Sequence, residues 1–252
     1  MCLIVFAWNQ HPDYRLILAA NRDEFHRRPT QDAHWWPDQP NILAGRDLQA
    51  GGTWLALTRK GRFATVTNYR EQAFTKASHK SRGELVTAFV TSDQDPAAFS
   101  RSIDGPDYAG FNLITADLND ANPSVSYVSN RDDPLVELDA GVYGLSNATL
   151  DTPWVKLTRS KDRLTRLIAD DDINETSLMR LLADREIATE DVDTEYLSIT
   201  QARAITAPFI VTEEYGTRCS SVLLWRKSGE VEFIERRFDA TGSQTGQSKF
   251  TF

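Results

Sequence analysis

The second residue of the chain carries its most reactive group. Cys2 follows Met1 directly and begins a hydrophobic run that ends at Trp8. Because an initiator methionine before a small residue is normally removed, we expect the mature chain to begin with Cys2. That residue would then carry a thiol and a free α-amine, which titrates at about 7.7–8.0 and can serve as a base. A buried cysteine after a start methionine is also common, so Cys2 alone does not distinguish a nucleophile from a core residue.

Four polar residues follow the next predicted strand. Two apolar runs, residues 3–8 and 15–20, flank a segment rich in turn-forming residues, which predicts a β-hairpin. A turn centred on that segment places Cys2 opposite about Asn21. A cation and carboxylates beside a cysteine can adjust the pKa of its thiol, as a nucleophilic cysteine requires. The simpler interpretation is that some of these four polar residues are caps or surface charges. The residues delivered there are Asn21, Arg22, Asp23 and Glu24.

Four short motifs together indicate a family. They are Met1-Cys2, Asn21-Arg22-Asp23-Glu24, Gly51-Gly52-Thr53-Trp54 and Thr67-Asn68-Tyr69-Arg70. This combination resembles the NRDE family, also called the transport and Golgi organisation protein 2 family, from Met1 to about Arg237. That family is similar to the cysteine N-terminal nucleophile (Ntn) hydrolases, in which an N-terminal cysteine attacks an amide carbonyl.

The resemblance implies a catalytic role for five residues. Cys2 matches the nucleophile, and Asp23 matches the aspartate at the end of the second strand. Asn68 resembles the asparagine of the oxyanion hole, and Asn147 resembles a second asparagine that completes the site. Arg218 is a looser match to a late arginine that supports it. Arg22 stands closer to the aspartate than in the hydrolases, and we expect substrate to be bound by three residues: Asn21, Arg22 and Tyr69.

The two asparagines also make chemical sense without the resemblance. A thiolate that attacks an amide carbonyl forms a tetrahedral oxyanion, which needs hydrogen-bond donors fixed in advance. The side-chain amides of Asn68 and Asn147 supply such donors without a competing charge, and both follow predicted strands. Asparagine also caps helices and turns, and each residue taken singly favours that interpretation. Their order after Cys2 and Asp23 favours a site.

The pattern of elements indicates an α+β protein. A second hairpin is predicted at residues 53–58 and 62–67, and Ser81 to Glu84 has capping-box spacing before a helix. Pro153 suits the first turn of a long helix with Trp154, Leu157, Leu164 and Ile168 buried. Further helices are expected at 95–103 and 175–183, and strands at 111–116, 124–129, 142–145, 220–226 and 230–238. The resemblance implies a four-layer αββα sandwich of two antiparallel sheets. Because no Pro/Gly/Ser-rich linker divides the chain, we expect one domain spanning 1–252, and its polar tail from about residue 240 is expected to be loosely held.

Composition excludes several classes of partner. The formal net charge is −8, and no basic stripe interleaved with aromatic residues occurs, which argues against nucleic acid. The apolar stretches are too short for a membrane span. Two cysteines far apart suggest a reducing compartment, so we expect the cytoplasm. We expect no metal and no cofactor, since the four histidines lack ligand spacing and no phosphate-binding glycine motif occurs. The sequence does not predict an oligomeric state.

Two functions fit these observations. The first is an amidohydrolase that cleaves a non-peptide C–N bond in a small acylated amide, with Cys2 as nucleophile. The second is a non-catalytic protein that binds and carries a hydrophobic small molecule in the same cleft. The resemblance supports this alternative as well, because eukaryotic members of the family are associated with haem handling and with lipid or acyl-coenzyme A metabolism.

Overall fold

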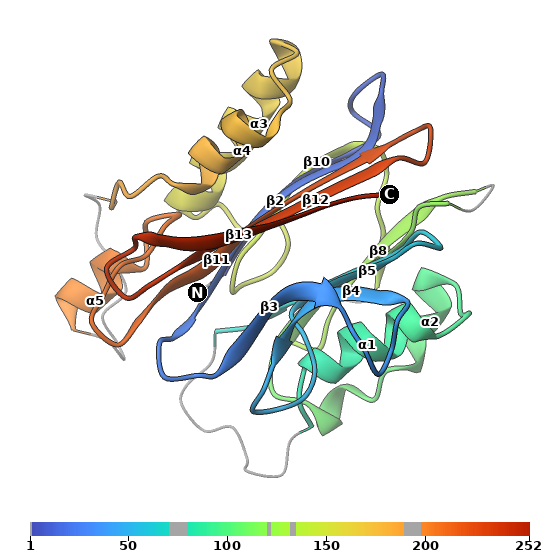
Figure 1. The fold of residues 1–252 in the computed structure, drawn as a ribbon, viewed down its shortest axis with the longest axis horizontal. Coiled ribbons are helices and arrows are strands. Elements are labelled where there is room, and N and C mark those ends of the chain that lie inside the picture. Colours follow the sequence, from blue (N-terminus) through green and yellow to red (C-terminus); the bar gives the residue numbers. More distant parts are fainter. Residues whose placement is uncertain (1, 71–79, 120–121, 132–134, 189–197) are drawn as a thin grey trace. The chain divides into compact units, whose positions relative to one another are not determined.

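The chain forms two compact units, each with one antiparallel sheet and its own helices. The computed structural model describes residues 2–70, 80–119, 122–131, 135–188 and 198–252 (Figure 1). The first unit comprises Met1–Arg27, Ala140–Ser146 and Leu150–Phe252, and the second comprises Arg28–Asp139 and Asn147–Thr149. The predicted α+β class with two antiparallel sheets is confirmed. The stacking order of the four layers and the single domain stay predictions.

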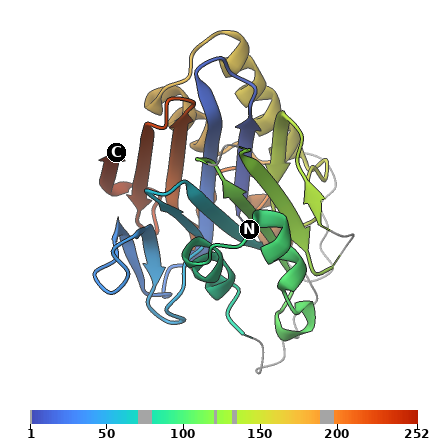
Figure 2. The same ribbon diagram turned by 90° about the vertical axis from the view of Figure 1, so that its right-hand side faces the viewer.

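The sheet of the first unit contains strands from both ends of the chain. Its order is β10-β1-β2-β11-β12-β13, and each neighbouring pair is antiparallel. The strands are β1 (Leu3–Trp8), β2 (Tyr14–Phe25), β10 (Gly141–Leu145), β11 (Tyr215–Arg226), β12 (Val231–Phe238) and β13 (Gln244–Thr251). The blue first hairpin lies beside the red C-terminal strands in Figure 2 because β2 pairs with both β1 and β11. This pairing brings the polar end of β2 beside the beginning of β11.

The predicted hairpin of β1 and β2 is present, with a register one residue away from the predicted one. Leu3, not Cys2, lies opposite Asn21. The next position of this register aligns Cys2 with Arg22. Strand β2 also extends to Phe25, beyond the apolar run, because β11 pairs along its whole length. Its four polar residues are therefore held in the sheet rather than in a loop.

Two helices cover one face of this sheet. α3 (Val155–Ala169) packs on β1 and β10, and α4 (Glu175–Leu182) packs on β2 and β11 (Figure 1). Alternate strand residues such as Leu3 and Val5 form the core beneath the helices, and the intervening residues Ile4 and Phe6 are buried too. Asn174 caps α4 by accepting a hydrogen bond from Ser177 N. A shorter helix, α5 (Ile199–Ala204), precedes β11.

The beginning of α3 differs from the sequence prediction. Trp154 is the N-cap, so Pro153 precedes the helix instead of occupying its first turn. The buried positions of α3 are Lys156, Leu157, Ser160 and Leu164. The hydrophobic pattern identified two of these four, and the buried stripe of α3 therefore contains a charged residue that the pattern did not identify.

The second unit has a sheet of order β3-β4-β5-β6-β7-β8-β9. Its strands are β3 (Thr30–Trp35), β4 (Ile42–Asp47), β5 (Leu55–Thr58), β6 (Arg62–Asn68), β7 (Phe111–Asp117), β8 (Ser124–Ser129) and β9 (Val136–Glu137). α1 (Gly83–Thr91) and α2 (Pro96–Ser102) pack on it, and η1 (Gly105–Asp107) is a short 3-10 turn. The hairpin of β5 and β6 is confirmed. The capping box predicted at Ser81 is wrong, because Arg82 is the N-cap of α1 and makes no side-chain cap hydrogen bond.

The polar tail is ordered as an edge strand, which corrects the expectation that it is loosely held. β13 pairs with β12 along the whole of its length. Phe250 stacks on Phe233 with ring centroids 6.5 Å apart, and Arg237 Nη1 donates to Ser248 Oγ at 2.8 Å. An edge strand has one exposed side and tolerates polar residues. Its composition therefore resembles that of a flexible tail.

Candidate functional site

The thiol of Cys2 lies at the beginning of β1 and is partly buried. Its Sγ is 3.9 Å from the backbone oxygen of Asp23, and its own carbonyl oxygen accepts a 2.6 Å hydrogen bond from Ser146 Oγ. Burial raises the pKa of the thiol, and the carboxylate of Asp23 raises it further, whereas Arg22 acts in the opposite direction. Cys2 therefore needs a base and a nearby cation to form a thiolate at neutral pH.

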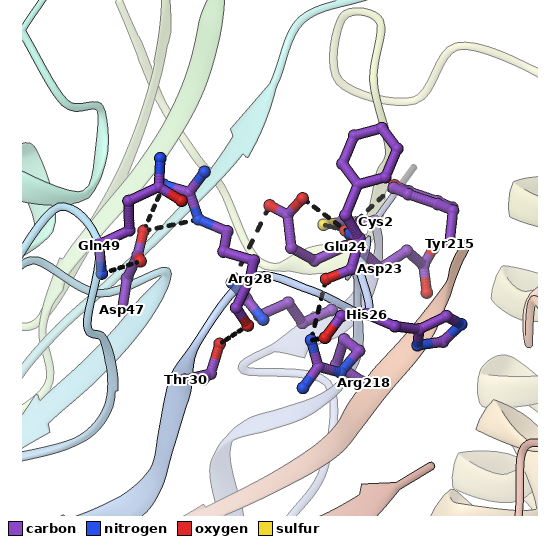
Figure 3. Close-up of polar contacts among 12 residues, drawn as sticks. Cys2, Asp23, Glu24, His26, Arg28, Thr30, Asp47, Gln49, Tyr215 and Arg218 are labelled. Carbon is purple, nitrogen blue, oxygen red and sulfur yellow. Dashed lines mark hydrogen bonds and ion pairs between the residues drawn. The ribbon is translucent and has the colours of Figure 1, made fainter. Parts of the chain in front are cut away.

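The carboxyl group of Asp23 is buried and held by residues at the beginning of β11. Thr217 Oγ1 donates to Asp23 Oδ1 at 2.7 Å. Tyr215 Oη donates to the backbone oxygen of Asp23 at 3.0 Å (Figure 3). Burial raises the pKa of Asp23, and Lys156, the Thr217 hydrogen bond and Arg22 oppose that rise. The predicted neighbours Cys2 and Asp23 are thus in contact, through the Asp23 backbone.

Arg22 supplies a buried cation beside both cysteines. Its side chain is 6% exposed, and its Nη2 lies 3.9 Å from Glu24 Oε2. In the β2–β11 register Arg22 lies opposite Cys219, and its charge favours the thiolate forms of Cys219 and Cys2. Burial raises the pKa of Cys219 well above its usual range, with Glu235 adding to the rise. Cys219 is therefore the less reactive of the two thiols.

The side chain of Asn21 is buried and hydrogen-bonded within the first unit. It is 1% exposed, and its Nδ2 donates to the backbone oxygens of Leu182 at 2.9 Å and Pro208 at 2.8 Å. Its Oδ1 accepts a 2.6 Å hydrogen bond from Ser220 Oγ. These bonds attach the end of α4 to the sheet and give Asn21 a structural role. Its contact with substrate stays a prediction.

Arg218 holds the end of β2. It occupies a bulge in the β2–β11 pairing, and its Nη1 donates to the backbone oxygens of Phe25 at 3.0 Å and His26 at 3.2 Å (Figure 3). These bonds fix the backbone just after the four polar residues of β2. The arrangement agrees with a supporting role, and direct participation in chemistry stays a prediction.

The two predicted oxyanion asparagines lie together in the second unit. Asn147 is buried, and its Nδ2 donates to the backbone oxygen of Asn68 at 2.7 Å. Asn147 O also accepts a hydrogen bond from Arg70 N at 2.6 Å. Asn68 is exposed at the end of β6, and the adjacent Tyr69 is attached through its backbone N to Gly110 O at 2.9 Å. Asn147 thus positions the backbone that carries Asn68.

Lys156 was missed by the sequence reasoning. It is 2% exposed, and it interacts electrostatically with Asp23 and Cys2. Burial lowers the pKa of its amine, and the two acids oppose that change. Its position one residue before Leu157 and four before Ser160 was the available signal, since such spacing places a residue on the buried face of a helix. Thr217, Tyr215 and Ser146 were also missed, because only long-range pairing brings them here.

Among the described residues, no group of three or more His, Cys, Asp or Glu side chains is arranged to hold a metal ion. Every helix among them is too short or too polar to span a lipid bilayer. Met1, whose removal the nucleophile prediction requires, lies outside the described residues.

Comparison with known proteins shows the family. The family described as "Transport and Golgi organisation 2" matches residues 1–240. The Mus musculus "Transport and Golgi organization 2 homolog" is 36% identical over 275 residues, covering 100% of this chain and 99% of the relative. The Homo sapiens homolog is 38% identical over 257 residues, covering 94% and 92%.

Among solved structures, the fold is similar to a "Caenorhabditis elegans N-acylethanolamine-hydrolyzing acid amidase (NAAA) ortholog", with a TM-score of 0.44 and 9% identity over 88% of this chain and 92% of that one. The full-length relatives and the family match confirm the resemblance inferred from the four motifs, and the chain belongs to the Transport and Golgi organisation 2 family.

Proposed function

We propose that this protein is a cysteine amidohydrolase that cleaves a non-peptide C–N bond in a small acylated amide. The observation that carries the proposal is the partly exposed Cys2 thiol in contact with Asp23 and near the buried cation of Arg22. A cysteine in the core would not need a buried carboxyl group and a buried guanidinium beside it, since buried charges are costly to maintain. Removal of Met1 is part of the proposal, because it supplies the base.

The reaction proceeds through a thioester. The Cys2 thiol transfers its proton to the Cys2 α-amine, and the sulfur attacks the carbonyl carbon of the amide. The tetrahedral intermediate collapses when the C–N bond breaks, and the ammonium returns the proton to the departing amine. Water, deprotonated by the same α-amine, then attacks the thioester carbonyl and releases the carboxylic acid and the thiol.

The asparagine pair of the second unit is the proposed oxyanion hole. Asn147 follows Ser146 directly in the chain, and Ser146 Oγ binds the carbonyl of Cys2. We take Asn68 and Asn147 to supply the donors that stabilise the oxyanion, a contribution of about 10²–10³ in rate per donor. Arg22 and Tyr69 are the proposed contacts to substrate, with Asp23 orienting the reacting residue and Arg218 holding the β2 end.

The proposed compartment is the cytoplasm. Both Cys2 and Cys219 are free thiols in the described residues, and a reducing compartment keeps thiols in that form. A nucleophilic cysteine also needs its thiol reduced to react. Thiol labelling in intact cells, followed by lysis and fractionation, would test this assignment. A disulfide-bonded Cys2 in the native cell would contradict it.

The decisive experiment is acyl transfer to Cys2. The purified protein is incubated with a panel of N-acyl amides and activated acyl esters of increasing chain length, and its intact mass and Cys2 peptide are followed over time. A transient acyl adduct on Cys2 together with released amine supports the hydrolase. Absence of any adduct, combined with tight binding of haem or of a long-chain acyl-coenzyme A, would show that the alternative binding and carrier function is correct.

A further inference from the structure

A buried lysine lies next to the acidic groups of the proposed site. Lys156 is 2% exposed and occupies the first turn of α3, which packs on β1 and β10. The next residue, Leu157, lies against Gly144 of β10, where an added Cβ would be 2.8 Å from the Leu157 side chain. The beginning of α3 is therefore pressed closely against the sheet. A lysine in such a position is rarely retained without a partner of opposite charge.

The alternation of β2 places Asp23 on the face that the helices cover. Asn21 points toward α4, since its Nδ2 donates to Leu182 O. Asp23 is two residues further along β2 and therefore shares that face. Its partner Thr217 also accepts a hydrogen bond from Ile210 N. Lys156 enters this face from α3 and interacts with Asp23 and Cys2.

We propose that Lys156 is a positioning residue whose ammonium group keeps Asp23 ionised and favours the thiolate of Cys2. The inference deepens the proposed function and rests on it for its catalytic meaning. Two acids in a buried site cannot both ionise unless a cation offsets their repulsion. Lys156 provides that cation from the helix side, as Arg22 does from the sheet side.

Titratable groups from three elements act on Cys2. Arg22 and Asp23 act from β2, Cys219 acts from β11 and Lys156 acts from α3. The free α-amine of the trimmed chain would add a further cation. Burial raises the pKa of Cys2 and of Asp23 and lowers that of Lys156, so each group alone tends toward its neutral form. A protonated Lys156 therefore adds to the groups that favour ionised Asp23 and Cys2.

Thiol alkylation tests this inference without a substrate. The rate of Cys2 alkylation by iodoacetamide is measured against pH by peptide mass spectrometry, in wild type, Lys156→Met and Lys156→Arg. Methionine keeps the volume and removes the charge, and arginine restores the charge. The matched control is Lys161→Met on the same helix, because Lys161 is 27% exposed and pairs with Asp151 at 2.6 Å.

The expected result is a shift of the alkylation midpoint in Lys156→Met by about one pH unit or more toward alkaline pH. That shift corresponds to about tenfold slower alkylation at neutral pH. Lys156→Arg should restore most of the rate, and Lys161→Met should match wild type. An unchanged midpoint in Lys156→Met overturns the inference. Normal alkylation with no acylation by any amide overturns the hydrolase proposal instead, so the two failures are distinguishable.

A second measurement decides the matter if Lys156→Met does not fold. In wild type labelled with ¹³C-lysine, the Lys156 side chain should report a protonated amine at neutral pH. Its midpoint should fall in Asp23→Asn, where the amide replaces the carboxylate at nearly constant volume. A neutral Lys156 amine at neutral pH, or a midpoint insensitive to Asp23→Asn, overturns the inference.

Discussion

The hydroxyl of Thr217 donates a 2.7 Å hydrogen bond to Oδ1 of Asp23 across 194 residues of sequence. The two residues lie opposite each other in the β2–β11 register. The same hydroxyl accepts a hydrogen bond from Ile210 N at 2.9 Å, so both of its functions are used. Strand β11, near the C-terminal end of the chain, therefore fixes the carboxylate that stands beside the first thiol.

Thr217→Val is expected to destabilise the protein by about 1–3 kcal/mol, because it leaves Asp23 and Ile210 without their shared partner. Thr217→Ser keeps the hydroxyl and should cost less. Burial already raises the pKa of Asp23, and loss of the Thr217 bond raises it further. An acid with a raised folded-state pKa loses stability as pH rises from its unfolded pKa to its folded pKa, and the loss is complete above the folded value. The deficit of Thr217→Val against Thr217→Ser should thus grow as pH rises above the unfolded pKa of an aspartate, about 3.9, in urea unfolding. A pH-independent deficit would contradict the link to Asp23.

Cys2→Ala should abolish acyl transfer and change unfolding free energy by about 1 kcal/mol or less, since the thiol is partly exposed. Ligand affinity should persist, because it depends on the cleft walls rather than on sulfur. The matched control is Cys219→Ala, which removes the buried second thiol and should leave acylation of Cys2 intact. Acyl adducts on the Cys2→Ala protein would show that another residue is the nucleophile.

A chain with an uncleavable extension before Cys2 should fold and lack amide hydrolysis. The extension converts the α-amine into a peptide nitrogen, which cannot accept the thiol proton. Turnover and thermal unfolding are compared with those of the trimmed chain, whose N-terminus is established by intact mass. Equal turnover in the two forms would disprove the α-amine as base.

Asn147→Ala should slow acylation about 10²-fold or more while leaving Cys2 alkylation unchanged, because an oxyanion donor acts only once the carbonyl is attacked. The control is Asn130→Ala. Asn130 also anchors backbone in the second unit, with its Oδ1 accepting from Phe111 N at 2.8 Å and its Nδ2 donating to Gly105 O at 3.0 Å. Equal losses of acylation in both variants would assign the effect to folding of the second unit.

Local patterns predicted much of the fold. Alternating or continuous apolar runs identified β1, β6, β7 and β8. They were sufficient because these elements pair with neighbours in sequence. Cys2 and Asp23 lie at the open end of one hairpin, so their proximity could also be predicted locally. The structure brings these two residues into contact. Whether Asn68 and Asn147 act with them stays a prediction.

Long-range pairing and strand edges could not be predicted from pattern. No local signal specifies that β2 pairs with β11, yet this pairing extends β2 through Asp23. β4 was overlooked because Gly45 interrupts its apolar run, although a Cβ there would clash with the ring of Trp54. Lys156 was overlooked because a charged residue is normally assigned to the solvent face. Its burial follows from the packing of α3 on β1 and β10, which no local pattern specifies.

Glu175 ties the C-terminal edge strand to α4. Its carboxylate accepts hydrogen bonds from Arg236 Nη2 at 2.8 Å, Lys249 Nζ at 3.2 Å and Gln247 Nε2 at 3.2 Å. Burial alone would raise the pKa of this carboxyl group, but the bonds from Arg236 and Lys249 outweigh burial and hold the pKa below its usual value. An acid with a lowered folded-state pKa stabilises the fold above its unfolded pKa, and this contribution disappears as pH falls through the folded value.

Glu175→Gln should therefore flatten the acid limb of the stability curve and cost about 1 kcal/mol at neutral pH, a modest figure because Glu175 is 23% exposed and solvent screens its charge. Amide exchange in residues 244–251 should accelerate, since β13 loses its contacts to the helix. Glu232→Gln is the matched control, because it removes only the contact with Lys249 at 3.2 Å and keeps α4 attached. If β13 exchanges equally fast in both variants, pairing with β12 holds the strand without help from Glu175.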